Sequence, residues 1–66
     1  MGTFERSYEV DGERFELYLE GSAGSRRYQL VDEENLPVGG AFSAVPDDAL
    51  VARVVRADRR AADSAA

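Results

Sequence analysis

The side chains that most often carry catalysis are missing from this chain of 66 residues, which contains no histidine, cysteine or lysine. Histidine is the commonest general base and metal ligand, the cysteine thiolate is a strong nucleophile, and lysine forms Schiff bases. Only carboxylates, hydroxyls and guanidinium groups remain for chemistry. We therefore expect a non-enzymatic protein that uses no cofactor and no metal ion.

Two acidic runs could in principle act as acid–base pairs or bind a cation. Asp47 and Asp48 stand at the expected start of a helix, where carboxylates stabilise the helix dipole. Residues 32–35 (Asp-Glu-Glu-Asn) lack the alternating ligand spacing and the central glycine of an EF-hand loop. We interpret the first run as a solvated helix start and the second as a solvated turn.

A stripe of arginines is the concentrated positive feature of the sequence. Arg53, Arg56 and Arg60 follow one another at i, i+3 and i+7, a spacing that could bind phosphates or an acidic protein. The stripe could equally be solvated or could pair with acidic residues of the same chain or of a second subunit. Residues 1–48 carry a net charge of −7 and residues 49–66 a net charge of +2, which gives −5 overall. Because an acidic chain repels phosphate backbones, the sequence favours a protein partner over nucleic acid.

Tyr18 and Val31 are predicted on a sheet face that the helix leaves uncovered, with Gln29 beside Tyr18. An aromatic side chain in such a position can anchor an interface, although a single exposed tyrosine on a strand is also common. The residues that we predict as candidates for binding a partner are Tyr18, Val31, Arg53, Arg56 and Arg60.

The element that should position Tyr18 is a hairpin around Asp11-Gly12, the dipeptide typical of a type I′ turn. It lies between two runs of alternating polarity, residues 4–10 and 13–20. A two-residue loop predicts a register in which one face is apolar and the other is mostly charged. The predicted pairs are Val10 with Glu13, Tyr8 with Phe15, Arg6 with Leu17, and Phe4 with Leu19.

A third strand over residues 26–31 follows the Gly- and Ser-rich connector 21–25, and its register sets Tyr28 opposite Leu19 and Leu30 opposite Leu17. Residues 36–43 are predicted as an irregular edge strand. Pro37 cannot donate to a ladder there, and Gly39-Gly40 favours a bulge. Such an edge would leave backbone groups free to pair with another strand.

A helix is predicted over residues 46–62, with Pro46 in its first position and fraying beyond residue 62. Its apolar side chains fall at helical spacing and should face the sheet; they are Leu50, Val51, Val54 and Val55. The predicted fold class is α+β, an antiparallel β-meander of three to four strands packed against one C-terminal α-helix. A chain of this length has room for a single domain, residues 1–66.

The N-terminal residues contain no apolar region typical of a signal peptide, and no stretch approaches the ~20 apolar residues of a membrane span. We therefore expect a cytoplasmic protein that makes no contact with membranes. Small domains often gain stability by self-association, so a homodimer is expected. The function that we predict is that of a protein-interaction or regulatory module. Its expected partners are a second copy of the chain and, as a further candidate, another protein. The alternative is a nucleic-acid-associated regulator that uses the arginine stripe.

The segments 15–18 (Phe-Glu-Leu-Tyr), 27–30 (Arg-Tyr-Gln-Leu) and 41–43 (Ala-Phe-Ser), followed by a terminal helix, resemble the small three-strand-plus-helix domains of the YegP type. The resemblance covers residues 15–60. The chain departs from that pattern because it lacks the Asn-Gly turn, has Pro37 in the following strand and adds a strand at residues 4–10. The resemblance implies a compact, dimer-forming domain of poorly defined role.

Overall fold

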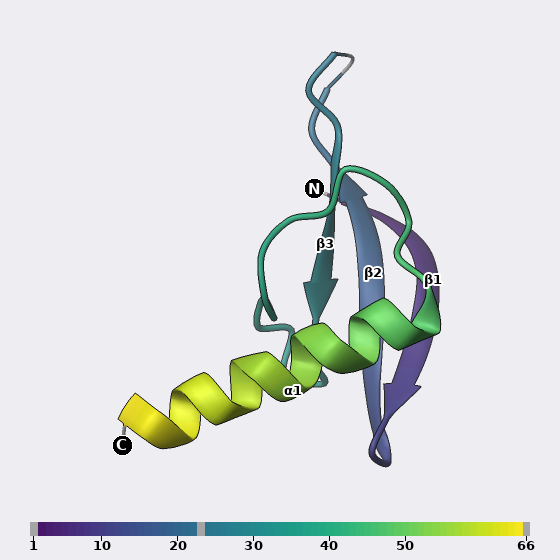
Figure 1. Cartoon of the computed structure of the whole chain (residues 1–66). Coiled ribbons are helices and arrows are strands. Elements are labelled where there is room, and N and C mark those ends of the chain that lie inside the picture. Colours follow the sequence, from purple (N-terminus) through teal and green to yellow (C-terminus); the bar gives the residue numbers. More distant parts are fainter. Residues whose placement is uncertain (1, 23, 66) are drawn as a thin grey trace.

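The computed structural model describes residues 2–22 and 24–65, with side chains up to residue 62. Three strands, β1 (Thr3–Val10), β2 (Glu13–Glu20) and β3 (Arg27–Val31), form one antiparallel sheet in the order β1-β2-β3. A single helix, α1 (Asp48–Ala65), lies over one face of this sheet (Figure 1). The long connection that leads to it pairs with the edge of β3 at two points. The predicted α+β meander is therefore confirmed, and the number of strands is three.

The turn between β1 and β2 has the geometry that its sequence predicts. Asp11 and Gly12 have φ angles of 50° and 84°, and a type I′ turn needs positive φ at both central residues. The predicted register holds from the Val10–Glu13 pair to the Arg6–Leu17 pair. Local turn chemistry thus sets which side chains of the hairpin share a face.

A bulge at Glu5 breaks this register near the start of β1. The prediction that Phe4 stands opposite Leu19 is wrong, because Phe4 pairs with Tyr18 and Thr3 pairs with Leu19. One extra residue in a strand reverses the alternation of its side chains beyond that point. Phe4 consequently leaves the predicted core face, and its side chain is 49% exposed.

The predicted register between β2 and β3 is confirmed, but the fourth strand at residues 36–43 is wrong. This segment meets β3 only through two isolated pairs, Val31 with Pro37 and Tyr28 with Phe42. The hydrogen bonds of the first pair are donated by Val38 N–H to Leu30 and by Asp32 N–H to Leu36. Gly39, with a φ of 68°, then turns the chain away before it returns at Phe42. The segment nevertheless covers the edge of β3, so the free edge of the described sheet is β1 rather than residues 36–43.

Helix α1 begins two residues later than predicted and ends three residues later, at Ala65. Asp47 is its N-cap, since its Oδ1 accepts a hydrogen bond of 2.8 Å from the backbone N–H of Leu50. Pro46 therefore precedes the cap instead of occupying the first helical position. Its carbonyl oxygen accepts a 2.7 Å hydrogen bond from the Tyr8 hydroxyl, which joins the helix start to β1.

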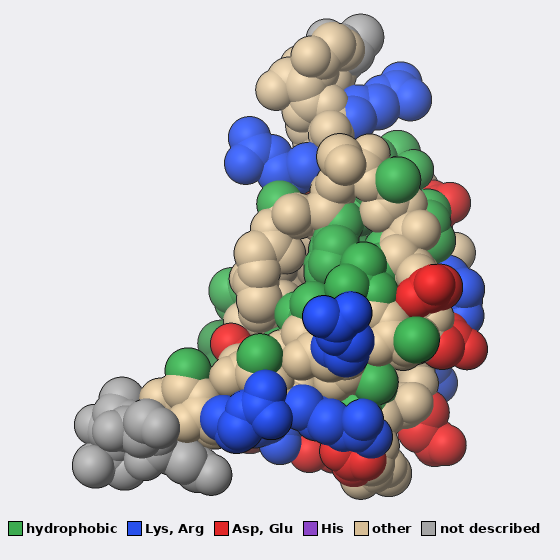
Figure 2. Space-filling model, viewed as in Figure 1, with side chains coloured by type: hydrophobic (Ala, Val, Ile, Leu, Met, Phe, Trp, Pro, Cys, Tyr) green, Lys and Arg blue, Asp and Glu red, His purple; other side chains and the backbone are tan. Residues whose placement is uncertain are grey.

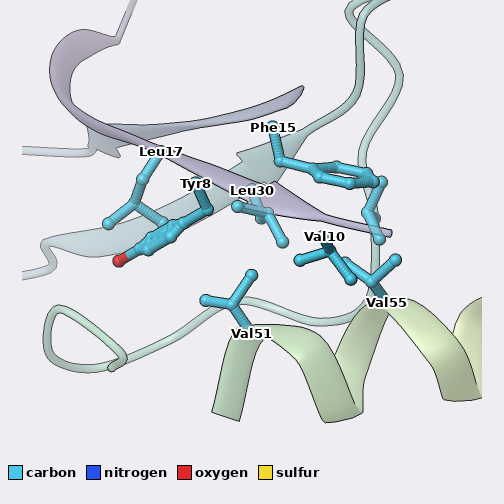
Figure 3. Packing of buried hydrophobic residues seen from close by; sticks show 8 residues of the cluster. Tyr8, Val10, Phe15, Leu17, Leu30, Val51 and Val55 are labelled. Carbon is cyan, nitrogen blue, oxygen red and sulfur yellow. The ribbon is translucent and has the colours of Figure 1, made fainter. Parts of the chain in front are cut away.

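The core lies between the sheet and α1, as Figure 3 shows for side chains from both layers. Val51 and Val55 of the helix are buried there, whereas Leu50 is 40% exposed, so the prediction that Leu50 faces the sheet is wrong. One residue along a helix turns the side chain by about 100°, which carries Leu50 off the buried side. The buried hydrophobic cluster consists of Tyr8, Val10, Phe15, Leu17, Leu30, Val38, Val51 and Val55.

Candidate functional site

The sheet face opposite α1 carries a hollow of about 500 Å³ over β2 and β3. No helix that the structure describes covers this face, because α1 lies on the other side of the sheet (Figure 1). The hollow is lined by Tyr18, Gln29, Val31 and Pro37, together with Gly2, Glu20 and Asn35. The structure thus brings the two predicted sheet residues, Tyr18 and Val31, into one site, which we call the Tyr18 hollow.

Tyr18 is held in place by contacts on two sides. The ring of Phe4 meets it edge-on, with ring centroids 5.8 Å apart and planes inclined by 72°. Aromatic pairs prefer this edge-to-face arrangement. Its hydroxyl donates a 3.1 Å hydrogen bond to Oε1 of Glu16. That bond raises the pKa of Tyr18 above its ordinary value, and desolvation adds to the shift. The hydroxyl therefore acts as a neutral hydrogen-bond donor beside a carboxylate.

Val31 and Gln29 complete the hollow from β3. Val31 is only 9% exposed, so it presents far less surface to a partner than the sequence suggested. Its strand position is fixed by the pair with Pro37. Gln29 is half-buried and donates from Nε2 to the carbonyl oxygen of Leu30 at 3.0 Å, which orients its side chain. The hollow combines apolar surface with three polar side chains, those of Glu20, Gln29 and Asn35. Binding sites commonly combine apolar surface with a small number of polar groups in this way.

The structure divides the predicted arginine stripe. Arg56 binds Asp11 through two hydrogen bonds of 3.0 and 3.2 Å, so the predicted alternative of pairing within the chain is correct for this residue. Its neighbour Arg59 binds Glu13 at 2.6 and 2.7 Å. These hydrogen bonds are the main cause of the lowered pKa values of the Asp11 and Glu13 carboxyl groups. Both arginines therefore fasten α1 to the hairpin.

Arg53 and Arg60 remain exposed, and neither forms an ion pair with another residue that the structure describes. They flank a second hollow of about 360 Å³ on the outer surface of α1. Its apolar lining is Leu50, Val54 and Ala57. Figure 2 shows this side of the molecule, where basic side chains gather along the helix next to hydrophobic ones. We call this surface the outer helix face.

The free edge of β1 is poorly suited to pairing with another strand. The bulge at Glu5 interrupts it, and bulges and charged side chains are features that block edge-to-edge association. Arg6 stacks over the Tyr8 ring at 4.2 Å and forms a 2.9 Å ion pair with Asp48. The bulge and these charges favour the sheet face over the edge as a binding surface.

The acidic side chains at residues 32–33 accept hydrogen bonds from backbone N–H groups. Asp32 Oδ1 accepts hydrogen bonds from the N–H groups of Glu34 and Leu36, and Glu33 Oε1 accepts one from the N–H of Arg14. Among the residues described, no group of three or more acidic side chains is placed to hold a metal ion. In the same residues, no helix is long and apolar enough to cross a membrane.

Sequence reasoning missed Phe4 and the Leu50–Val54 surface as parts of candidate sites. Phe4 meets the Tyr18 ring only because of the bulge, for which residues 3–6 contain no glycine or other turn residue as a signal. The spacing of Leu50 and Val54 was visible, but the same spacing also predicts core positions. Only the packing of Val51 and Val55 distinguishes the two cases.

Comparison with protein-family models, with curated proteins and with solved structures found no match to this chain. The resemblance to YegP-type domains consequently gains no support from a family model. The fold, the two hollows and their charges are therefore the observations from which a function can be inferred.

Proposed function

We propose that this chain is a small non-enzymatic protein-interaction module, which binds a protein partner through the Tyr18 hollow. The observation that carries the proposal is the Phe4–Tyr18 aromatic pair at the border of an uncovered hollow of about 500 Å³. Clustered aromatic side chains with limited conformational freedom are the residues that most often dominate binding energy at protein interfaces.

The surroundings of the hollow support a protein as the partner. The lining side chains are mostly apolar or uncharged, and the strands beneath hold them in fixed positions. Glu20 is the charged residue of the lining and is exposed, so an apolar partner side chain can pack on Tyr18 and Pro37 while the carboxylate stays in water. The hollow is shallow and open, so it fits a side chain or two on another protein's surface better than an enclosed small molecule.

The nucleic-acid alternative also stays a proposal, with less in its favour. Arg56 and Arg59 are already paired with carboxylates of the hairpin, whereas Arg53 and Arg60 form no ion pair with the side chains that the structure describes. The remainder of the chain is strongly acidic and would repel phosphates.

Affinity capture from an extract of the cells that make the protein would test the proposal. The tagged chain is compared with Phe4→Ser/Tyr18→Ser and with Leu36→Ser, a matched control in which a large side chain of 53% exposure outside the hollow is removed. Circular dichroism first checks that all three proteins fold. We expect the unaltered chain and the control to retain at least one cellular protein in similar amounts. The double variant should retain at least tenfold less of that protein.

The tenfold reduction corresponds to about 1.4 kcal/mol, a modest requirement for losing two aromatic contacts at an interface. Equal retention by all three forms would overturn the proposal, because the Tyr18 hollow would then make no contribution to binding.

A further inference from the structure

We propose that the occupant of the Tyr18 hollow is the outer helix face of a second copy of the chain, so that the protein associates head to tail. This inference rests on the proposed function, since it names the partner for the same site. It is carried by the match between two surfaces that belong to one molecule.

The two surfaces share an apolar centre. The Tyr18 hollow offers the Tyr18 ring, Val31 and Pro37, and the outer helix face offers Leu50 and Val54 around a hollow of its own. Leu50 is 40% exposed although it is one of the largest apolar side chains of the helix. Contact would remove from water mainly the surface of the Tyr18 ring, Pro37 and Leu50, because Val31 and Val54 are already largely covered. Removing apolar surface from water is the main driving force for association.

The charges around the two centres are of opposite sign. Glu20 lines the Tyr18 hollow, whereas Arg53 and Arg60 line the outer helix face. Glu16, beside the Tyr18 hydroxyl, is already paired with Arg14 at 3.6 Å. Arg14 and Arg27 reduce the acidity of the sheet, but residues 1–48 keep a net charge of −7. Opposite potentials orient two proteins on approach and disfavour contacts between like surfaces.

The placement of these surfaces determines the form of the assembly. Figure 1 shows α1 and the sheet as two layers. The outer helix face belongs to the helix layer, and the Tyr18 hollow lies on the side of the sheet away from α1. A pair of copies therefore uses one surface from each and leaves the other two free, which makes the contact heterologous. The assembly should lengthen with concentration rather than stop at the closed homodimer expected from the sequence.

The contact should be weak, since both hollows are small and the whole accessible surface is only 4663 Å². A standard interface of about 800 Å² per partner would use roughly one sixth of it. The experiment should accordingly extend to about 1 mM protein, where a contact with a dissociation constant of that size is appreciably occupied.

Two variants, each blocked on one surface, provide the test. Glu20→Arg/Gln29→Arg places positive charge at the Tyr18 hollow and leaves the outer helix face intact. Arg53→Gln/Arg60→Gln removes the cations of the outer helix face and leaves the Tyr18 hollow intact, and glutamine keeps the helix propensity high. All four altered side chains are exposed or half-buried, so both variants should fold. The exposed Arg26→Gln is the matched control.

Light scattering and sedimentation equilibrium at low salt measure the mass of each sample. The unaltered chain and the Arg26→Gln control should exceed the monomer mass of 7.2 kDa increasingly with concentration. For each blocked variant alone, the dissociation constant of self-association should be at least about tenfold higher than for the unaltered chain. Their equimolar mixture should recover association but stop at twice the monomer mass, because one pair of intact surfaces remains.

Two outcomes would overturn the inference: an unaltered chain that stays monomeric at about 1 mM, or blocked variants that associate as strongly as the unaltered chain. Either result leaves the proposed function separately testable. A cellular protein lost from the Phe4→Ser/Tyr18→Ser capture would still support binding through the Tyr18 hollow, with a different occupant.

Discussion

Gly39 lies where the connection to the helix passes closest to α1, and its replacement by alanine should be unusually damaging. A Cβ atom at this position would overlap Cγ1 of Val54, and the residue has a φ of 68°. A left-handed backbone costs a non-glycine residue about 1–2 kcal/mol. Overlap in a packed region costs about 1–3 kcal/mol. We therefore expect Gly39→Ala to lower the free energy of unfolding by about 2–5 kcal/mol.

Two other glycines separate these contributions. Gly12 has a φ of 84° with no neighbouring atom within 4 Å of an added Cβ, so Gly12→Ala should show the backbone cost alone, about 1–2 kcal/mol. At Gly40 an added Cβ would also meet nothing within 4 Å, and φ is not positive. Gly40→Ala should leave stability unchanged or raise it by up to about 1 kcal/mol, because alanine restricts the unfolded chain.

Urea denaturation followed by circular dichroism measures all three variants. A domain of this size has a total stability of roughly 3–10 kcal/mol, so Gly39→Ala would remove a large part of it. The double variant Gly39→Ala/Val54→Ala should be more stable than the two single effects predict, since Val54→Ala removes the overlapping atom. The reasoning is refuted if Gly39→Ala costs no more than Gly12→Ala and shows no coupling to Val54→Ala.

Two further predictions concern the links between α1 and the hairpin. Tyr8→Phe should lower the free energy of unfolding by about 1–2 kcal/mol in urea denaturation, because the carbonyl oxygen before the helix loses its buried donor; an unchanged midpoint would contradict this. The hydrogen bonds to Arg56 and Arg59 hold the carboxyl pKa values of Asp11 and Glu13 below their ordinary values of 3.8 and 4.5. These two ion pairs therefore stabilise the fold fully above pH 3.8 and 4.5, and the stabilisation is lost as the pH falls through the lowered pKa values of the folded state. In Arg56→Gln/Arg59→Gln the carboxyl pKa values measured by NMR titration should return toward 3.8 and 4.5, and the urea midpoint should fall less on acidification than in the unaltered chain; identical titration curves would contradict the role of these pairs.

The strands, the hairpin register near its turn and the helix were predictable because their signals act over a few residues. Asp11-Gly12 selects a turn by its own backbone preferences, and alternation in the adjoining runs then assigns the side chains to faces. The α+β class follows from three such runs and one helical run in that order. Tyr18 could be placed on the uncovered face for the same reason, since it lies within five residues of Glu13, where the register begins.

The rest depended on contacts between segments far apart in the chain. The bulge at Glu5 has no local signal and moves Phe4 from the core side to the face of Tyr18. The helical periodicity predicted Leu50 and Val51 equally as core residues. Of these two, only Val51 is buried where α1 crosses the sheet.

The arginines show the same division between sequence and structure. Their spacing along one helix determined that the positive charges share a surface, because helical geometry repeats locally. Which of them remain available depended on where the hairpin meets the helix, 45 residues apart for Arg56 and Asp11. The sequence by itself thus determined the elements and the surfaces that each could present. Only the tertiary structure decided which surfaces are consumed in packing and which stay exposed, since burial is a property of two surfaces in contact and not of either one alone.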